Sequence, residues 1–301
     1  MLHSRTTPHD KRRALRAGLS GGELLRLPGA INPLSARAIE RAGFDGVYVS
    51  GAVLAADLAL PDIGLTTLSE VAERSQAIAR VTGLPTLVDA DTGFGEPMNT
   101  ARTIQILEDA GLAGCHIEDQ VNPKRCGHLD GKTISPLPDA VRRLRAAVDA
   151  RRDPDFVVCA RTDVRTTGGL AATIERAKAF AEAGADLIFP EALADAAEFE
   201  AMRKAVDVPI LANMTEFGQS TLLTTTTLRD LGINVVIYPV TLFRLIMGTV
   251  TESLKIIDAE GTQAGLVERM QTRGELYDLL DYSGYATFDA DVLTHGYRED
   301  R

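Results

Sequence analysis

Eight short apolar runs recur at similar intervals along the chain, and this repetition restricts the fold more than any other feature of the sequence. Each run is almost continuously apolar and rich in Val, Ile or Leu, as is typical of strands buried on both faces. Strands of this kind predict a parallel sheet covered by helices. The runs span residues 25–32, 45–51, 85–91, 114–120, 156–163, 186–192, 209–216 and 234–240.

The segments between these runs have helical periodicity. Apolar residues three and four apart lie opposite a charged face in 69–83, 100–111, 139–150 and 170–184. Eight complete strand–helix units predict a (β/α)8 TIM barrel rather than a doubly wound open sheet. No G-x-G-x-x-G motif, which is typical of dinucleotide-binding open sheets, follows the first strand. Glycines that can end a helix in the left-handed conformation precede several runs, at Gly43, Gly83, Gly111, Gly184 and Gly232.

The chain is expected to form one α/β domain over residues 1–301. The barrel should cover about 20–245, since the eighth run ends at residue 240. Two further helical patterns predict C-terminal helices at about 246–283. The remaining segment, 284–301, is polar and is expected to form an irregular tail.

Charge and composition exclude several classes of partner. A formal net charge of −10 argues against nucleic acid and anionic membranes, because phosphate binding needs clustered Lys and Arg. The sequence has no run of about 18 apolar residues, so no membrane span is predicted. The basic N-terminus lacks the apolar core of a signal peptide. Three cysteines, an odd number, favour a reducing compartment and a cytoplasmic protein. A small anionic substrate is still compatible, because a few arginines or a metal can outweigh the global charge.

Polar and ionisable residues stand where nearly every predicted strand ends. Barrel enzymes carry their chemistry at these carboxyl ends, and an unpaired buried charge is costly. These side chains should therefore contact one another or a ligand. They are Tyr48, Ser50, Asp89, Asp91, Glu118, Asp119, Arg161, Asp163, Glu191, Asn213, Thr215, Glu216 and, after the eighth strand, Arg244.

Asp89 and Asp91 are two residues apart on one predicted strand, so their carboxylates share a face and would repel each other without a cation. Together with Glu118 and Asp62 they make an all-oxygen set that suits Mg²⁺ or Mn²⁺ rather than zinc. The alternative is that Asp91 only caps the glycine-rich turn that follows it. The acidic Glu118 at the end of the next strand favours the metal site.

The loop after the fourth strand differs from the rest of the chain, because it is polar and glycine-rich and carries Cys126 close to three basic residues, Lys124, Arg125 and His128. Adjacent cations predict a lowered thiol pKa, which suits an acid or base near neutral pH; a nucleophile is the alternative. The glycines allow the loop to close as a lid. Cys115 and Cys159 lie in apolar runs and are expected to be core residues.

The sequence K-R-C-G-H at 124–128, after H-I-E-D-Q at 116–120, resembles the signature of the isocitrate lyase/phosphoenolpyruvate mutase superfamily. Within it the chain is most similar to 2-methylisocitrate lyases, above all the actinobacterial members, from about residue 20 to 283. These enzymes form pyruvate and succinate in the methylcitrate cycle of propionate breakdown. The matching segments are LPGAINPLSAR, YVSG, LPDIG, VDADTGFG, ARTD, FPEA, LANMTEFG and TRGELYD.

The resemblance implies roles for individual residues. Asp89 and Asp91 would bind Mg²⁺, with Mn²⁺ as a substitute, and Asp62 and Glu118 would hold its water ligands. Ala52 stands where many members have glycine, and its methyl group would narrow the pocket slightly. The family also implies a C-terminal helix swapped between subunits and a homotetramer built as a dimer of dimers. The implied substrate-binding residues are Ser50, Gly51, Ala52, Cys126, Gly127, Arg161, Glu191, Asn213, Met214, Thr215, Arg244 and Arg273.

The resemblance and the residues together imply a Mg²⁺-dependent cleavage of a tricarboxylate. The metal would stabilise the enolate-like pyruvate product, and Tyr48 would assist loss of the hydroxyl proton. Cys126 would act as the general acid/base and protonate the succinate carbanion, with Lys124 and His128 tuning the thiol.

Three alternatives stay open at this point. An isocitrate lyase would share the chemistry, but its members usually read K-K-C-G-H and are much longer. Oxaloacetate- or phosphonopyruvate-cleaving relatives lack the loop cysteine. A non-catalytic binding protein on the same fold would be expected to have lost some charged strand ends, and Asp89, Glu118, Arg161 and Glu191 are all present.

Overall fold

The computed structural model describes residues 4–128 and 131–295, and the chain divides into two compact units. One unit is Arg5–Phe243, and the other consists of Met1–Ser4 with Arg244–Arg301. Each unit is described here by itself. Within the described residues, no helix combines the length and the apolar character needed to cross a membrane.

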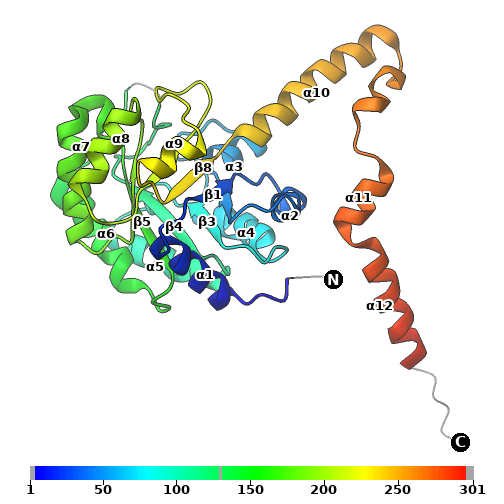
Figure 1. Cartoon of the computed structure of the whole chain (residues 1–301), viewed down its shortest axis with the longest axis horizontal. Coiled ribbons are helices and arrows are strands. Elements are labelled where there is room, and N and C mark those ends of the chain that lie inside the picture. The colour runs from blue at the N-terminus through cyan, green and yellow to red at the C-terminus, as the bar shows by residue number, and fades with distance from the viewer. Residues whose placement is uncertain (1–3, 129–130, 296–301) are drawn as a thin grey trace, which may run out of the picture. The chain divides into compact units, whose positions relative to one another are not determined.

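The first unit contains eight parallel strands, each inside one of the predicted apolar runs (Figure 1). Five of them form a sheet in the order β2-β3-β4-β5-β6, and three form a sheet in the order β1-β8-β7. Parallel bridges Gly29–Tyr48 and Ile188–Ile210 join the two sheets and close the ring. The predicted barrel is therefore confirmed. The strands are β1 Leu25–Pro28, β2 Val47–Val49, β3 Thr86–Asp89, β4 Gly114–Glu118, β5 Val157–Thr162, β6 Leu187–Pro190, β7 Leu211–Asn213 and β8 Val235–Tyr238.

Helices follow the strands and surround the ring (Figure 1). They bury a shell of apolar side chains between themselves and the outer faces of the strands. Four of the five predicted helix-ending glycines have positive φ; the exception, Gly83, donates its N–H to the Glu40 carboxylate at 2.8 Å. The helices of this unit are α1 Pro8–Ser20, α2 Pro33–Arg41, α3 Gly51–Asp57, α4 Leu68–Ala79, α5 Pro97–Asp109, α6 Leu137–Ala150, α7 Arg165–Glu182, α8 Ala196–Ala205 and α9 Thr225–Asp230.

Helix α1 closes the amino-terminal end of the barrel, and the sequence patterns had not indicated it. Leu15 and Leu19 pack into the inner cluster formed by strand residues such as Leu27. The buried guanidinium of Arg12 donates to the carbonyls of Leu112 (2.9 Å) and Glu108 (2.6 Å). The ammonium of Lys11 likewise donates to the Ala79 carbonyl at 2.7 Å. Carbonyls far away in the sequence thus satisfy two cations that would otherwise keep the helix in solvent.

The second unit is helical, with α10 Thr241–Glu260 crossing into it from the first, a 3₁₀ turn at Ala264–Arg269, α11 Arg273–Leu280 and α12 Tyr282–His295. We expected an irregular tail at 284–301. Helix α12 instead continues to His295, so this expectation is wrong for the residues before that point. Residues 282–295 contain no proline, the residue that breaks a helix most strongly. None of the residues of α10 is buried, and its exposed apolar side chains are Leu245, Ile246, Met247, Val250, Leu254 and Ile257.

Candidate active site

Three predicted acidic residues meet at the carboxyl ends of β3 and β4. Asp89 ends β3, Glu118 ends β4, and Asp91 follows β3 with a positive φ of 46°. The backbone N–H groups of Gly51 and Asp91 donate to the Asp89 carboxylate at 3.2 and 3.0 Å. All three carboxylates are buried. A Cβ atom at Gly51 would lie 2.8 Å from Asp89 Oδ2, so the close approach of these two elements requires glycine.

Burial and charge act in opposite directions on this cluster. Burial raises the pKa of Asp89, but His116, Lys124 and Arg161 together lower it to about 2. Burial, together with the neighbouring Asp89 charge, raises the pKa of Asp91 to about 6. Burial also raises the pKa of Glu118 well above its ordinary value. The carboxylates therefore compete for positive charge, which is the condition that favours a bound cation.

Lys124 supplies one such charge from the loop after β4. Its ammonium lies 2.7 Å from Asp91 Oδ1 and also pairs with Asp62. Although burial lowers the pKa of Lys124, the surrounding carboxylates raise it above its ordinary value. Lys124, which was predicted to tune the thiol of Cys126, thus pairs with two carboxylates of the predicted metal site.

The cluster also fits a hard divalent cation. Both carboxylate oxygens of Glu118 are buried and have no hydrogen-bond partner among the described residues, and the nearest Arg161 nitrogen is 3.4 Å away. Oxygens that lack donors can hold water molecules or a metal. Because every candidate ligand is a carboxylate, the donor set suits Mg²⁺ or Mn²⁺.

His116 lies at the centre of the site, although the sequence patterns gave it no role. It is fully buried, and its Nε2 lies 2.7 Å from the Tyr48 hydroxyl. Its Nδ1 is 3.7 Å from Asp89 Oδ1. Burial lowers the pKa of His116 to about 4, so the imidazole is neutral near pH 7. Its position two residues before Glu118 on one strand was the available signal, since such residues share a face.

A second group of charges lies at the ends of β5 and β6. The Arg161 guanidinium donates to both oxygens of Asp163 at 3.0 Å and lies 3.3 Å from Glu191. Asn213 donates to both Glu191 oxygens at 3.2 and 3.3 Å. Although burial raises the pKa of Glu191, Arg161 and His128 lower it to about 2. We call Arg161, Asp163, Glu191 and Asn213 the polar wall. It adjoins the carboxylate cluster, since Arg161 Nε lies 3.4 Å from Glu118.

The loop carrying Cys126 packs onto this wall. A Cβ atom at Gly127 would lie 2.3 Å from the Glu191 side chain, so this contact also requires glycine. His128 Nε2 lies 3.1 Å from Glu191 Oε1, and its Nδ1 accepts the N–H of Gln219 at 3.0 Å. With Nδ1 occupied as an acceptor, the ring proton resides on Nε2 and faces Glu191.

The predicted lowering of the Cys126 pKa is wrong. The thiol is half-buried, and burial raises its pKa above the ordinary value, with Glu191 adding to the rise. Its basic neighbours point elsewhere: Lys124 pairs with Asp62 and Asp91. His128 Nε2 faces Glu191. Adjacency in sequence does not make two side chains face each other.

We expect iodoacetamide to label Cys126 before the other cysteines, with a rate that rises about tenfold per pH unit from pH 7 to 9 because only the thiolate reacts. Cys115 and Cys159 are fully buried, and burial raises the pKa of both thiols. Peptide mapping after timed labelling measures this, and denatured protein, in which all three thiols react, is the control. Early labelling at Cys115, or a rate already constant above pH 7, would contradict it.

The other predicted residues occupy varied positions. Ser50 precedes α3, and Gly51 and Ala52 begin that helix beside Asp89. Met214 and Thr215 are buried after β7, and the Met214 sulfur accepts the Leu223 N–H at 3.2 Å. Arg244 and Arg273 belong to the second unit, and their assignment to the site stays a prediction.

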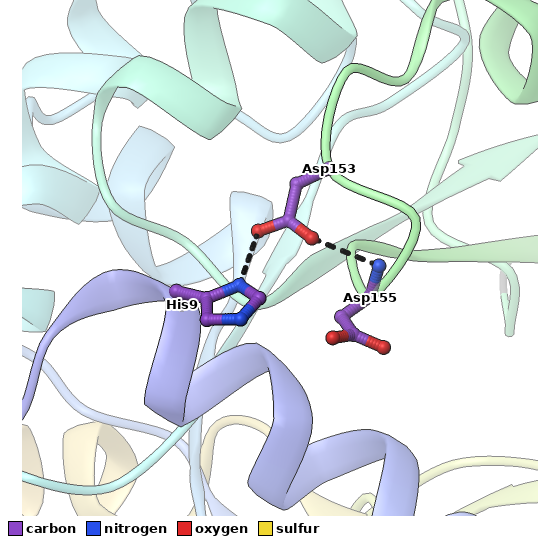
Figure 2. A group of neighbouring side chains, drawn as sticks. All are labelled: His9, Asp153 and Asp155. Carbon is purple, nitrogen blue, oxygen red and sulfur yellow. Dashed lines mark hydrogen bonds and ion pairs between the residues drawn. The ribbon is translucent and has the colours of Figure 1, made fainter.

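A different acidic group lies at the opposite end of the barrel (Figure 2). Among the described residues, ligand atoms of His9, Asp153 and Asp155 lie within 4.8 Å of one another. Asp153 precedes β5, and its carboxylate contacts His9 Nδ1 at 3.2 Å. Arg12 already pairs with Asp153 at 2.8 Å, so the charge of this carboxylate is compensated by α1. The group is separate from the metal site predicted at Asp89 and Asp91.

Comparisons with known proteins agree with this geometry. The model of the phosphoenolpyruvate phosphomutase family matches residues 15–257. A probable 2-methylisocitrate lyase of Corynebacterium glutamicum is 61% identical over 98% of this chain and 96% of its own. A 2-methylisocitrate lyase of Escherichia coli is 46% identical over 92% of this chain and 94% of its own.

Solved structures are similar over almost the whole chain. A 2,3-dimethylmalate lyase of the phosphoenolpyruvate mutase/isocitrate lyase superfamily superposes with a TM-score of 0.87 at 31% identity, over 96% of each chain. A phosphonopyruvate hydrolase bound to oxalate and Mg²⁺ does so with a TM-score of 0.85 at 30% identity, over 94% of this chain and 99% of its own. The chain therefore belongs to the phosphoenolpyruvate phosphomutase family, within the superfamily that the loop at 124–128 indicated.

Proposed function

We propose that this chain is a carbon–carbon lyase that cleaves 2-methylisocitrate into pyruvate and succinate. The observation that carries the proposal is the meeting of the Asp89–Asp91–Glu118 cluster with the Cys126 loop and the Arg161–Glu191 wall at one end of the barrel. The identity of 61% to the Corynebacterium protein supports the same substrate. The tricarboxylate would contact both the carboxylate cluster and the polar wall.

We propose Asp89 and Asp91 as the ligands of Mg²⁺, with Mn²⁺ as a substitute, and Asp62 and Glu118 as the residues that hold its waters. When bound, the metal supplies positive charge to the oxygens of the enolate-like pyruvate product. The unpartnered oxygens of Glu118 support this assignment.

Tyr48 and His116 are suited to remove the proton of the substrate hydroxyl group. With its own proton on Nδ1, facing Asp89, His116 presents the Nε2 lone pair to the Tyr48 hydroxyl at 2.7 Å. Tyr48 can then accept the substrate proton while its own proton passes to His116. Burial strongly raises the pKa of Tyr48, so a neutral tyrosine that transfers a proton is favoured over a free phenolate.

Cys126 is suited to deliver a proton to the carbanion of the succinate half. A raised pKa keeps the thiol protonated near pH 7, which is the form that a general acid needs. Arg161, Asn213 and Thr215 would bind the carboxylate next to this carbanion, and Lys124 and His128 would bind anionic oxygens. Ser50 to Ala52, Gly127, Glu191, Met214, Arg244 and Arg273 complete the proposed substrate-binding set.

We further propose that the barrel and its C-terminal helices act as one domain of a cytoplasmic homotetramer. Free cysteines support a reducing compartment. Helix α10 has no buried residue and exposes a row of large apolar side chains, which supports burial against a second copy of the chain.

The specificity test compares pyruvate release from 2-methylisocitrate with glyoxylate release from isocitrate. One methyl group in a pocket is worth a discrimination of roughly 10- to 200-fold, so 2-methylisocitrate should have the higher kcat/KM by about this factor. Ala52→Gly, which removes one methyl group beside the site, is the matched variant and should change the ratio without abolishing cleavage. A higher kcat/KM for isocitrate would support an isocitrate lyase instead.

A further inference from the structure

The loop that carries Cys126 leaves and re-enters the barrel through a short stem. Gln120 pairs with Ile134 as antiparallel neighbours, and the Val121 N–H donates to the Thr133 carbonyl at 2.8 Å. The Ser135 N–H closes the stem by donating to the Asp119 carbonyl at 2.8 Å. A residue that holds this stem in place therefore also holds the base of the loop that carries Cys126 and His128.

Asp119 joins the stem to the end of β5. Its carboxylate is almost completely buried and accepts from the Thr162 hydroxyl at 2.7 Å and from the Asp163 N–H at 2.9 Å. Asp163 in turn accepts hydrogen bonds from Nε and Nη2 along one edge of the Arg161 guanidinium, both at 3.0 Å. One carboxylate outside the substrate-binding set thus connects the loop to the orientation of Arg161.

Arg176 is the cation that completes this junction. It projects from α7, and its Nη1 donates to Asp119 Oδ2 at 3.0 Å. Its Nη2 donates to the Ser135 carbonyl at 2.7 Å. A single guanidinium thus contacts both strands of the stem. The Arg176 side chain is 13% exposed and that of Asp119 is 1% exposed, so loss of one partner leaves the other charge buried and unpaired.

We propose that Asp119 and Arg176 are positioning residues that fix the stem of the Cys126 loop, so that Gly127 and His128 stay against Glu191, and that keep Arg161 in its orientation. Neither residue is part of the substrate-binding set. Their effect on turnover rests on the proposed lyase function, but their effect on the accessibility of Cys126 does not. Loss of the pair frees the stem, so Cys126 is exposed to solvent more often and Arg161 loses its fixed support.

The experiment uses Arg176→Met, which keeps the length of the side chain and removes its charge and its donors. Arg143→Met is the matched control, since Arg143 also reaches the stem, at the carbonyls of Glu118 (3.3 Å) and Gln120 (3.4 Å), without pairing to a carboxylate there. The first measurement, without substrate, is the rate at which iodoacetamide labels Cys126 at pH 8. We expect Arg176→Met to raise this rate about tenfold and Arg143→Met to leave it nearly unchanged.

The second measurement is cleavage of 2-methylisocitrate. Arg176→Met should lower kcat about 100-fold because the reacting groups are no longer held in place, and Arg176→Lys should recover part of it. Thermal unfolding verifies that each variant is folded. If Arg176→Met does not fold, Arg176→Lys, which can reach only one of the two partners, must show an intermediate rise in labelling.

Two outcomes separate this inference from the proposed function. The positioning role is overturned if the folded Arg176→Met variant has the labelling rate and the kcat of the unmodified protein. If Arg176→Met does not fold, the same result for Arg176→Lys overturns it. If the unmodified protein does not cleave 2-methylisocitrate, the proposed function fails, and the labelling rates alone decide the role of Asp119 and Arg176.

Discussion

Replacing Asp91 with asparagine should lower kcat for 2-methylisocitrate by at least about 100-fold, because the change removes a charged ligand of the proposed metal, which would stabilise the transition state. The fold should be retained, since asparagine tolerates the positive φ of 46° at this position. The substitution also removes a carboxyl group whose pKa is raised to about 6 by burial and by the neighbouring charge of Asp89. Pyruvate release measures turnover, and calorimetric titration with Mg²⁺ or Mn²⁺ measures the expected loss of affinity.

Asp155→Asn is the matched control for that variant. It makes the same acid-to-amide change in the group formed with His9 and Asp153 at the other end of the barrel, and it should leave turnover and metal affinity unchanged. Chelation should abolish the activity of the unmodified protein, and added Mg²⁺ should restore it. Full activity in excess chelator, or an Asp91→Asn variant with unchanged metal affinity, would rule out the proposed metal site.

The Cys126→Ser variant is expected to keep its fold and its metal affinity and to lose at least about 100-fold in kcat, since proton transfer by a positioned group contributes this much. A serine hydroxyl is too weak an acid near pH 7 to deliver the proton. The half-buried position of Cys126 tolerates the small change in size. Single-turnover measurements of pyruvate and succinate show whether the loss lies in the chemical step.

Cys159→Ala serves as the control, because it removes a buried thiol from the inner cluster of the barrel. We expect it to lower the unfolding temperature and to leave kcat almost unchanged. Near-normal turnover in Cys126→Ser, or an equal loss in both variants, would disprove the role of Cys126 as general acid.

The barrel was predictable from sequence because its strands are buried on both faces and therefore appear as continuous apolar runs. Helix α1 was not predictable in the same way. Leu15 and Leu19 are its main apolar contacts. In the sequence, Lys11 and Arg12 resemble charged residues on a solvent-exposed face, although both are buried. Their partners are carbonyls on other elements, which no local pattern reveals.

The site was predictable to the extent that carboxyl ends of parallel strands must meet. Asp89, Glu118, Arg161 and Glu191 come together for this reason. The environment of Cys126 was not, since the directions of neighbouring side chains depend on the folded loop. Arg176 was missed because a charge on an amphipathic helix reads as part of its solvent face, whereas here it reaches inward to Asp119.

The two junctions in the ring, Gly29–Tyr48 and Ile188–Ile210, have a consequence for how the pocket can diverge during evolution. The five-stranded sheet carries Asp89 and Glu118 together with Tyr48 and His116, so the proposed metal ligands and the proposed proton-transfer residues share one sheet.

Asn213 lies on the three-stranded sheet. The Gly29 junction tolerates little change, since a Cβ atom there would lie 2.1 Å from the Pro239 carbonyl oxygen. Substitutions near Ile188–Ile210 can instead change how β6 and β7 lie against each other. They would shift Asn213 relative to the five-stranded sheet and leave the proposed metal ligands and proton-transfer residues in place. Relatives of this fold include an oxaloacetate acetylhydrolase, a 2,3-dimethylmalate lyase and a phosphonopyruvate hydrolase. We expect adaptation to substrates of different width to accumulate along this one edge.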